Sequence, residues 1–187
     1  MDKHLLSSEL QSERISLKRH SLDLAPTMFK YVDQDRDRLR RFLPWVDHQN
    51  NLQDEIDYIK LTHKRWDDYT SFDYGIFDKS SETYMGNIGV HTINWANECC
   101  EIGYWLLSKF EGKGFMSNSL KVLERHLFEV GFNRVEVRCS DINERSANVP
   151  KYNGYTFEGE LRQNSIELNE FRNTKIFSKL KSEYFKS

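Results

Sequence analysis

The sequence predicts a mixed α/β protein, a single domain built on one sheet with a parallel crossover at its centre. Three observations lead to this fold class. A strand, a glycine loop, a helix and a second strand follow one another from Glu101 to Cys139, which is the order of a parallel crossover. Two strand patterns at 72–78 and 83–95 precede it as a hairpin. The 187 residues, 38% of them hydrophobic, are enough for one domain, 1–187, with a sizeable core.

Short strands and helices are expected in the first part of the chain. Ile15 and Leu17 alternate with polar neighbours, which indicates a first strand. Ser21 or Asp23 can cap a helix over 24–32.

A strongly charged helix is expected over 35–43, because Pro44 cannot continue it. It contains four arginines: Arg36, Arg38, Arg40 and Arg41. We interpret them as a solvated helix face in preference to a phosphate site. Asn50 or Asn51 can cap a longer helix that runs through 56–66.

Three antiparallel strands in a meander are expected next. The strands at 72–78 and 83–95 join through the polar turn 79–82, and a turn at 96–98 returns the chain to the central strand. Residues 102–107 are almost wholly apolar, which suits a strand buried on both faces.

A glycine loop separates the central strand from an amphipathic helix. Gly112 and Gly114 allow a sharp turn and a close approach of a ligand to backbone N–H groups. The apolar stripe of the helix has the spacing 4, 3, 4, 3 and consists of Met116, Leu120, Leu123, Leu127 and Val130. Gly131 can end this helix, and the alternation over 135–139 predicts the second strand.

The last part of the chain predicts one short helix and two strands. A polar segment can cap a helix that carries Ser146, and Pro150 limits the length of that helix. A turn at 152–155 then leads into strands over 156–161 and 175–180.

A glycine loop that opens a helix predicts an anion site, because several N–H groups there lack intrahelical partners. A tight turn without a ligand is the alternative. Two familiar glycine motifs fit poorly. The phosphate loop of nucleotide hydrolases has a different spacing, and the dinucleotide motif would place Ser117 where glycine or alanine is needed.

Composition excludes several classes of function. The net charge of −2 supplies no basic field for nucleic acid or an anionic membrane. The N-terminus has no apolar core of signal-peptide length, and no apolar stretch approaches the length of a membrane helix, so we expect a cytoplasmic protein. Cys99, Cys100 and Cys139 lack the spacing of a zinc site and are odd in number, so we expect buried thiols, no disulfide framework and no metal.

The loop resembles the cofactor-binding segment of the GNAT N-acetyltransferases, Gln/Arg-x-x-Gly-x-Gly/Ala. Gly114 matches the central glycine of this motif, whereas Glu111 and Met116 depart from it. A carboxylate at Glu111 would repel a pyrophosphate unless it points away. The resemblance implies the GNAT fold, a mostly antiparallel sheet of six to seven strands with a parallel splayed pair at the cofactor site, flanked by helices.

Five blocks in order resemble one branch of that family, the RimJ/RimL-type ribosomal-protein N-terminal acetyltransferases. These blocks are 42–46, 101–106, 112–114, Asn143-x-x-Ser146, and 154–159 without residue 156. The resemblance implies transfer of acetyl from acetyl-CoA, as cosubstrate, to a primary amine. A ribosomal protein N-terminus is the acceptor it suggests.

The resemblance also assigns site residues. Backbone N–H groups would hold the pyrophosphate at Gly112, Lys113, Gly114, Phe115, Met116 and Ser117. The end of the central strand at Leu106 would bind pantetheine and polarise the carbonyl, and Asn143 would contact pantetheine. Ser146 would give a proton to the leaving sulfur, with a helix cap as its alternative role.

Acetyl transfer also needs a neutral amine. For the base we favour Glu101 on the central strand, with Glu136 and His91 as alternatives; alternation does not reveal which face of the sheet Glu101 uses. Two other functions stay open, namely acetylation of a small amine such as a polyamine, amino acid or antibiotic, and acetyl-CoA binding without catalysis. Aromatic residues such as Trp45 or Trp66 could serve a homo-oligomer.

Overall fold

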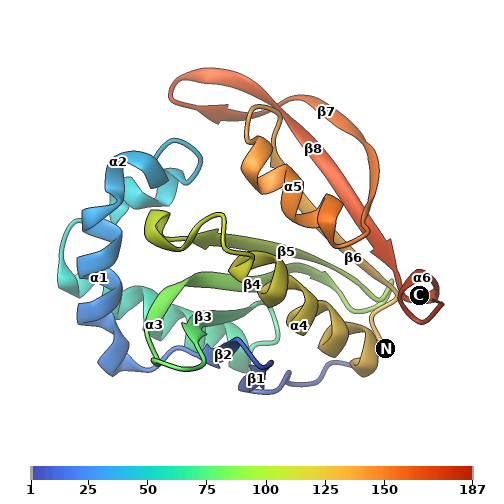
Figure 1. Cartoon of the computed structure of the whole chain (residues 1–187), viewed down its shortest axis with the longest axis horizontal. Helices are drawn as coiled ribbons and strands as arrows, with labels where there is room; N and C mark the ends of the chain where they lie inside the picture. The colour runs from blue at the N-terminus through green and yellow to red at the C-terminus, as the bar shows by residue number, and fades with distance from the viewer. Residues whose placement is uncertain (1, 187) are drawn as a thin grey trace.

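In the computed structural model, which describes residues 2–186, an eight-stranded sheet is flanked by helices (Figure 1). The strands are β1 Glu9–Gln11, β2 Ile15–Arg19, β3 Phe72–Asp78, β4 Tyr84–Asn94, β5 Cys99–Leu106, β6 Arg134–Ser140, β7 Thr156–Glu167 and β8 Glu170–Leu180. The α-helices are α1 Ala25–Gln34, α2 Arg36–Leu39, α3 Leu52–Asp67, α4 Phe115–Val130, α5 Glu144–Tyr152 and α6 Lys181–Tyr184. Segments of 3-10 helix complete the order: η1 Leu22–Leu24, η2 Pro44–His48 and η3 Ser108–Phe110.

The strands are ordered β1-β2-β3-β4-β5-β6-β8-β7. Within residues 2–186, β5 and β6 form the one parallel pair, and the other neighbours are antiparallel. The predicted meander and central crossover are therefore confirmed. The sheet has one strand more than the upper expectation of seven, because β1 is three residues long and too short to show an alternation.

The cross-strand register decides which side chains share a face of the sheet. Ile102 of β5 lies opposite Val137 of β6, and both belong to the core that packs against α4. We call this side the α4 face. Glu101, Gly103 and Trp105 alternate to the other side, where Trp105 packs on the core formed with α1 and α3. We call that side the α3 face.

The long helices begin and end largely as their sequences predict. The stripe of α4 is buried through its three leucines, and Gly131 ends the helix with φ 119°. Asn51 caps α3 and accepts a hydrogen bond from the backbone N–H three residues on. The predicted caps of α1 are wrong. Ser21 precedes η1, makes no side-chain cap bond, and α1 begins only after Leu24.

Three predicted elements have the wrong length. α2 covers only Arg36–Leu39 of the expected 35–43. The last two strands are longer than expected, because β7 is an edge strand exposed along most of its length. The alternation of side chains along β7 is interrupted at Gln163, which has φ 52°, and the pairing of β7 with β8 resumes at Ser165.

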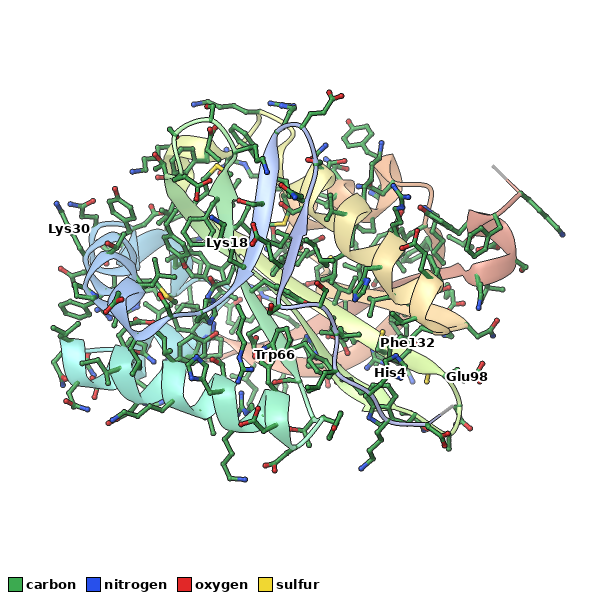
Figure 2. All side chains as sticks on the ribbon, turned by 90° about the horizontal axis from the view of Figure 1, so that it is seen from below. His4, Lys18, Lys30, Trp66, Glu98 and Phe132 are labelled. Carbon is green, nitrogen blue, oxygen red and sulfur yellow. The ribbon has the colours of Figure 1, made fainter. Side chains whose placement is uncertain are left out.

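Aromatic side chains fill the core beside α3. Trp66 packs edge-on against Phe72 and Tyr74, with ring centroids 4.9 and 5.2 Å apart. Such pairs contribute about 0.5–1.5 kcal/mol beyond the area they bury. Figure 2 shows Trp66 between α3 and the strands, and the residue is 1% exposed. The suggestion that Trp66 could serve a dimer surface is therefore wrong.

A polar cluster is buried in the core between α3 and the sheet. His20 Nε2 lies 3.1 Å from Asn87 Oδ1, and the hydroxyl of Tyr84 donates to the same oxygen at 2.8 Å. Glu55 of α3 is 2% exposed, and its Oε2 has no hydrogen-bond partner among the described residues. Burial raises the pKa of Glu55 from 4.5 to about 7 and lowers the pKa of His20 from 6.5 to about 4. Both groups therefore favour their neutral forms in the folded protein.

Candidate active site

The parallel strands β5 and β6 separate at the centre of the sheet. Their pairing joins Cys99–Ile102 to Arg134–Val137. Beyond that point β5 continues with β4 through Leu106, whereas β6 continues with β8 through Ser140. Backbone groups that face the gap between the strands are thus available to a ligand. The predicted burial of this strand on both faces is wrong, because residues 103–105 stay partly exposed at the separation.

The glycine loop lies where β5 leads into α4. Gly112 and Gly114 have φ values of 70° and 78°, in the left-handed region that favours glycine. Gly114 is the N-cap of the 16-residue helix α4 and provides no side-chain cap. The first N–H groups of a helix have no intrahelical acceptor, so those from Phe115 to Ser117 can bind an anion. Met116 is 8% exposed and packs in the core, so only its backbone can take part.

Arg14, which the sequence did not single out, lies against this loop. Its Nη2 donates to the carbonyl of Lys113 at 3.1 Å, and its guanidinium stacks 5.0 Å from the ring centroid of Phe115. A Cβ atom on Gly114 would lie 3.6 Å from Arg14 Nη1. The turn between β1 and β2 therefore places a cation beside the predicted anion site.

Glu111 is paired with two arginines. Arg38 Nη1 donates to Glu111 Oε1 at 2.6 Å, and Arg145 of α5 pairs with Glu111 Oε2. Arg38 Nη2 also donates to the carbonyl of Leu106 and to Asp35, both at 2.6 Å. The negative charge of Glu111 is therefore balanced by two arginines beside the loop. These ion pairs link α2 to α5 across it.

The arginines of the charged helix have different roles. Arg36 donates to the carbonyls of Val46 and Gln49 at 2.6 and 2.5 Å. Its side chain is 22% exposed, and that of Arg38 is 32% exposed. The interpretation as a solvated face is therefore wrong for Arg36 and Arg38. Arg40 and Arg41 are exposed.

Ser146 and Asn143 lie together at the start of α5. Asn143 Oδ1 accepts from the backbone N–H of Ser146 at 3.1 Å, so this side chain caps the helix. The hydroxyl of Tyr104 donates to the carbonyl of Ser146 at 2.9 Å. Burial raises the pKa of Tyr104 well above its ordinary value, so it stays protonated. Burial likewise raises the pKa of Cys139, near the end of β6, to about 11.

The candidate bases lie on the α3 face. Glu101 Oε2 is 3.5 Å from Arg138 Nε, and Glu101 Oε1 is 4.0 Å from His91 Nε2. Burial raises the pKa of Glu101, and the charge of Arg138 opposes that shift. Glu136 forms hydrogen-bonded ion pairs with both Arg134 and Arg138 at 2.8 Å. These pairs hold the pKa of Glu136 below its ordinary value against the effect of burial, which disfavours it as a base.

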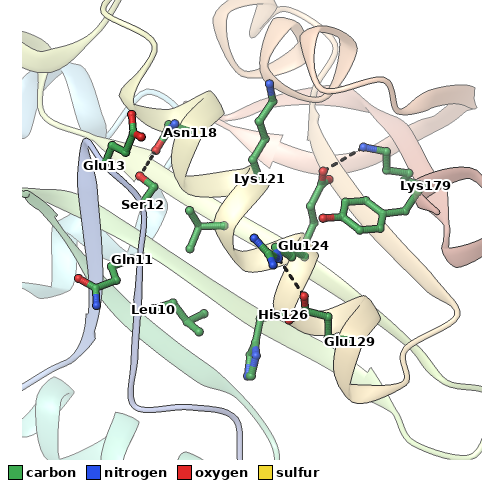
Figure 3. Close-up of a pocket in the computed structure, with 13 residues that line it drawn as sticks. Leu10, Gln11, Ser12, Glu13, Asn118, Lys121, Glu124, His126, Glu129 and Lys179 are labelled. Carbon is green, nitrogen blue, oxygen red and sulfur yellow. Dashed lines mark hydrogen bonds and ion pairs between the residues drawn. The ribbon is translucent and has the colours of Figure 1, made fainter. Parts of the chain in front are cut away.

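Two hollows lie away from these residues. A groove of about 620 Å³ follows the outer side of α4 (Figure 3), with a hydrogen bond of 2.6 Å between Ser12 and Asn118 at one end. Lys179 and Glu124, 2.9 Å apart, mark its other end. A hollow of about 270 Å³ lies between 40–47 and the turn 166–169. None of the residues predicted for the site lines either hollow.

Residues 2–186 were also compared with the requirements of disulfides, metal sites and membrane-spanning helices. The three cysteines are free thiols. Across residues 2–186, no three His, Cys, Asp or Glu side chains converge as metal ligands. In the same range, every helix is too short or too polar to cross a lipid bilayer.

Comparison with known sequences gives a consistent set of relatives. A profile described as the acetyltransferase (GNAT) domain matches residues 14–156. The chain is 26% identical over 175 residues to YdaF of Bacillus subtilis (strain 168), covering 92% of this chain and 94% of YdaF. It is 23% identical over 173 residues to the ribosomal-protein-serine acetyltransferase of Escherichia coli (strain K12), covering 90% of this chain and 94% of that enzyme.

Solved structures share the fold. A complex of RimL, a ribosomal L7/L12 α-N-protein acetyltransferase, with coenzyme A superposes with a TM-score of 0.86 at 21% identity. The match covers 95% of this chain and 98% of RimL. The microcin C7 self-immunity acetyltransferase MccE, in complex with acetyl-CoA and AMP, gives the same TM-score of 0.86 at 24% identity. That match covers 90% of this chain and 93% of MccE.

Proposed function

This chain belongs to the acetyltransferase (GNAT) domain family, and from that premise we propose that it uses acetyl-CoA to acetylate a protein N-terminal α-amine. One observation carries the proposal. The left-handed glycines that open α4 lie at the end of β5, next to the place where β5 and β6 separate. An anion site beside two diverging strands suits a long cosubstrate with a pyrophosphate and an extended pantetheine arm. The naming of relatives as ribosomal-protein acetyltransferases supports the choice of acceptor.

The residues present fit acetyl-CoA. Backbone N–H groups at Gly112 to Ser117 would bind the pyrophosphate, and Arg14 would add a cationic side chain next to Gly114. The strand end at Leu106 would bind pantetheine. Asn143 Oδ1 is occupied by the cap of α5, so its contact with pantetheine would use the side-chain NH₂ group. When bound, acetyl-CoA supplies an activated acyl group as a thioester.

Proton donation is assigned to Ser146. The hydroxyl of Tyr104 on β5 donates to the carbonyl of Ser146, so the start of α5 lies beside the separated strands. A free thiol has a pKa near 8.5, so the leaving sulfur needs only modest help from a donor. Tyr104, which stays protonated, hydrogen-bonds the backbone of Ser146 and would hold it in place.

Proton removal is assigned to Glu101 on the opposite face. Because burial raises its pKa, the carboxylate gains basicity relative to an exposed glutamate. An α-amine with a pKa of about 7.8 is roughly one part in seven neutral at pH 7, whereas a lysine near 10.4 is below about one in a thousand. The difference is about 3.5 kcal/mol, so an α-amine needs less from the base than a lysine side chain does.

Calorimetry and acetyl-transfer assays test this function together. We expect micromolar binding of acetyl-CoA that depends on the pyrophosphate, and hence much weaker binding of a pantetheine-only fragment. We expect transfer to a peptide with a free α-amine to exceed transfer to the same peptide with a blocked N-terminus and one lysine. Faster transfer to a polyamine, amino acid or antibiotic would replace the proposed acceptor. Binding without turnover on any amine would contradict catalysis.

Replacing Ser146 with alanine should lower kcat about 10-fold, less than the roughly 10²–10⁴-fold typical of a general acid, because the leaving thiolate is a weak base and needs little help from a donor. The dissociation constant of acetyl-CoA should not change, since backbone groups provide most of its contacts. Steady-state kinetics and calorimetry measure the two quantities. Ser146→Thr keeps a hydroxyl and is the matched control. An unchanged kcat for Ser146→Ala would exclude Ser146 as the proton donor.

A further inference from the structure

One side chain of α2 holds the segment between the end of β5 and the glycine loop, residues 106–111. Arg38 Nη2 donates to the carbonyl of Leu106, at the start of this segment, at 2.6 Å. Arg38 Nη1 donates to Glu111 Oε1, at the end of the segment, also at 2.6 Å. The same guanidinium therefore contacts both ends of the proposed cosubstrate site, the strand end and the loop.

Arg38 is fixed in turn by Asp35, the residue that precedes α2. Asp35 Oδ2 accepts from Nε and Nη2 of Arg38 at 3.1 and 2.6 Å, and from the backbone N–H of Ser108 at 2.8 Å. Burial alone would raise the pKa of Asp35, but these hydrogen bonds lower it overall, so the carboxylate stays ionised at pH 7. Arg38 thus uses three nitrogens on three acceptor groups, a fork that the single nitrogen of a lysine lacks.

The carbonyl of Leu106 points into the gap between β5 and β6. The next N–H group, that of Leu107, donates to the carbonyl of Met85 on β4 at 2.9 Å. In a trans peptide the C=O and the following N–H point in opposite directions, so the Leu106 carbonyl faces away from β4. In an extended strand the N–H and C=O of one residue point the same way, so the N–H of Leu106 also faces the gap. Arg38 thus orients the backbone that is proposed to polarise the acyl carbonyl.

The carboxylate of Glu111 lies next to the proposed anion site, which begins at Gly112. Besides Arg38, it pairs with Arg145. The side chain of Arg145 is 81% exposed, whereas that of Arg38 is 32% exposed. Water screens an exposed ion pair, so Arg145 alone would compensate the charge of Glu111 only weakly. Without Arg38, Glu111 would repel a pyrophosphate bound at the loop.

We propose that Arg38 is a positioning residue for acetyl-CoA that acts through Glu111 and Leu106. Through Glu111 it removes the repulsion between the loop and the pyrophosphate. Through Leu106 it fixes the strand end against which the thioester would lie. The inference rests on the proposed use of acetyl-CoA. It makes α2 part of the cosubstrate site, although α2 lies outside the unit of strand, loop and helix that the sequence pattern reveals.

Substitutions at positions 38 and 111 test the electrostatic part. Arg38→Met removes the donors and the charge but keeps a long side chain. We expect it to weaken the binding of acetyl-CoA about 10-fold, because an unpaired carboxylate is left beside the pyrophosphate. Adding Glu111→Gln to Arg38→Met should restore the dissociation constant to within about threefold of the wild type. Glu111→Gln alone should not weaken binding. Calorimetric titration with acetyl-CoA measures all four proteins.

The strand end gives a second readout. With a peptide α-amine as acceptor, kcat should stay about 10-fold low in the double variant, because the Leu106 carbonyl still lacks its donor. Arg38→Lys keeps the charge without the fork, so it should bind acetyl-CoA within about threefold of the wild type and show the same low kcat. Arg40→Met is the matched control. Arg40 pairs with Asp47 at the surface, 3.2 Å away, so its loss should change neither quantity.

The outcomes separate this inference from the proposed function. Equal affinity for acetyl-CoA in the wild type and in Arg38→Met would overturn the inference, even if the protein acetylates α-amines. A loss of affinity that Glu111→Gln does not restore would also overturn it, since a disrupted α2 would behave in that way. A normal kcat in the double variant would overturn the role of Leu106. An affinity that follows these substitutions in a protein that acetylates no amine would support the inference and contradict the proposed catalysis.

Discussion

Gly114→Val is expected to weaken the binding of acetyl-CoA at least about 100-fold. A β-branched residue cannot adopt φ 78° without strain, so the start of α4 must rearrange and its N–H groups lose their common direction. The new side chain would also crowd Arg14, since even a Cβ atom lies 3.6 Å from Nη1. Charge-assisted hydrogen bonds contribute about 1.5–3 kcal/mol each, so losing two accounts for the factor of 100. Calorimetric titration with acetyl-CoA measures the loss.

The matched control lies at the other end of the same helix. Gly131 also has a positive φ, 119°, and ends α4. Gly114→Ala and Gly131→Ala should therefore both lower the melting temperature, because each places a Cβ atom in the left-handed region. Only Gly114→Ala should weaken binding. Equal affinity for acetyl-CoA in wild type and Gly114→Val would remove the loop from the cosubstrate site.

Glu55→Gln is expected to change the free energy of unfolding in a pH-dependent way. The effect of the substitution on that free energy should be more favourable at pH 8 than at pH 4 by about 3 kcal/mol. The folded pKa of Glu55, about 7, lies above its ordinary value of 4.5, so its contribution to stability is fully present below pH 4.5. It is lost as pH rises through 7, because the carboxylate must ionise without a partner for Oε2. The difference of 2.5 units between these pKa values corresponds to about 3 kcal/mol. Urea unfolding from pH 4 to 8 gives the free energy of unfolding of each variant.

Two comparisons isolate this effect. His20 has the opposite dependence, since its lowered pKa favours the folded state above pH 6.5 and that stability is lost as pH falls through about 4. His20 is present in both proteins, so its contribution cancels to first order in the difference. Asp57→Asn changes an exposed carboxylate on the same helix and should show no such trend. A pH-independent difference between Glu55→Gln and the wild type would contradict an ionising Glu55 in the core.

Local patterns predicted most of the sheet and its central crossover. The period of α4 and the alternation of β3 and β6 arise from burial of one face, and a buried face leaves a clear pattern. Elements with little burial were not predicted, or were predicted with the wrong length. β1 is short and mostly exposed, and no residue of β7 is fully buried, so their apolar residues show no usable period. The cap of α1 was misplaced because η1 comes before the helix.

The candidate site also contains features that the sequence predicts from local patterns. The glycine loop is visible in the sequence because a left-handed backbone restricts the choice of residue, and Gly112 and Gly114 meet that restriction locally. The position of Asn143 three residues before Ser146 likewise determines a local cap. The roles proposed for these residues in binding and proton donation remain predictions.

Only the tertiary structure decided which charged residues meet at the site. Arg14 reaches Lys113 across 99 positions of sequence, and Arg38 reaches Glu111 across 73. The same holds for the face used by Glu101, since strand alternation gives two equivalent sides until helices cover one of them. The sequence by itself determined the loop and the elements around it, because their causes are local backbone geometry and one-sided burial. The orientation of Glu101 depends on the register between strands, and the contacts of Arg14 and Arg38 depend on how turns and helices pack around the loop, so both are properties of the whole fold.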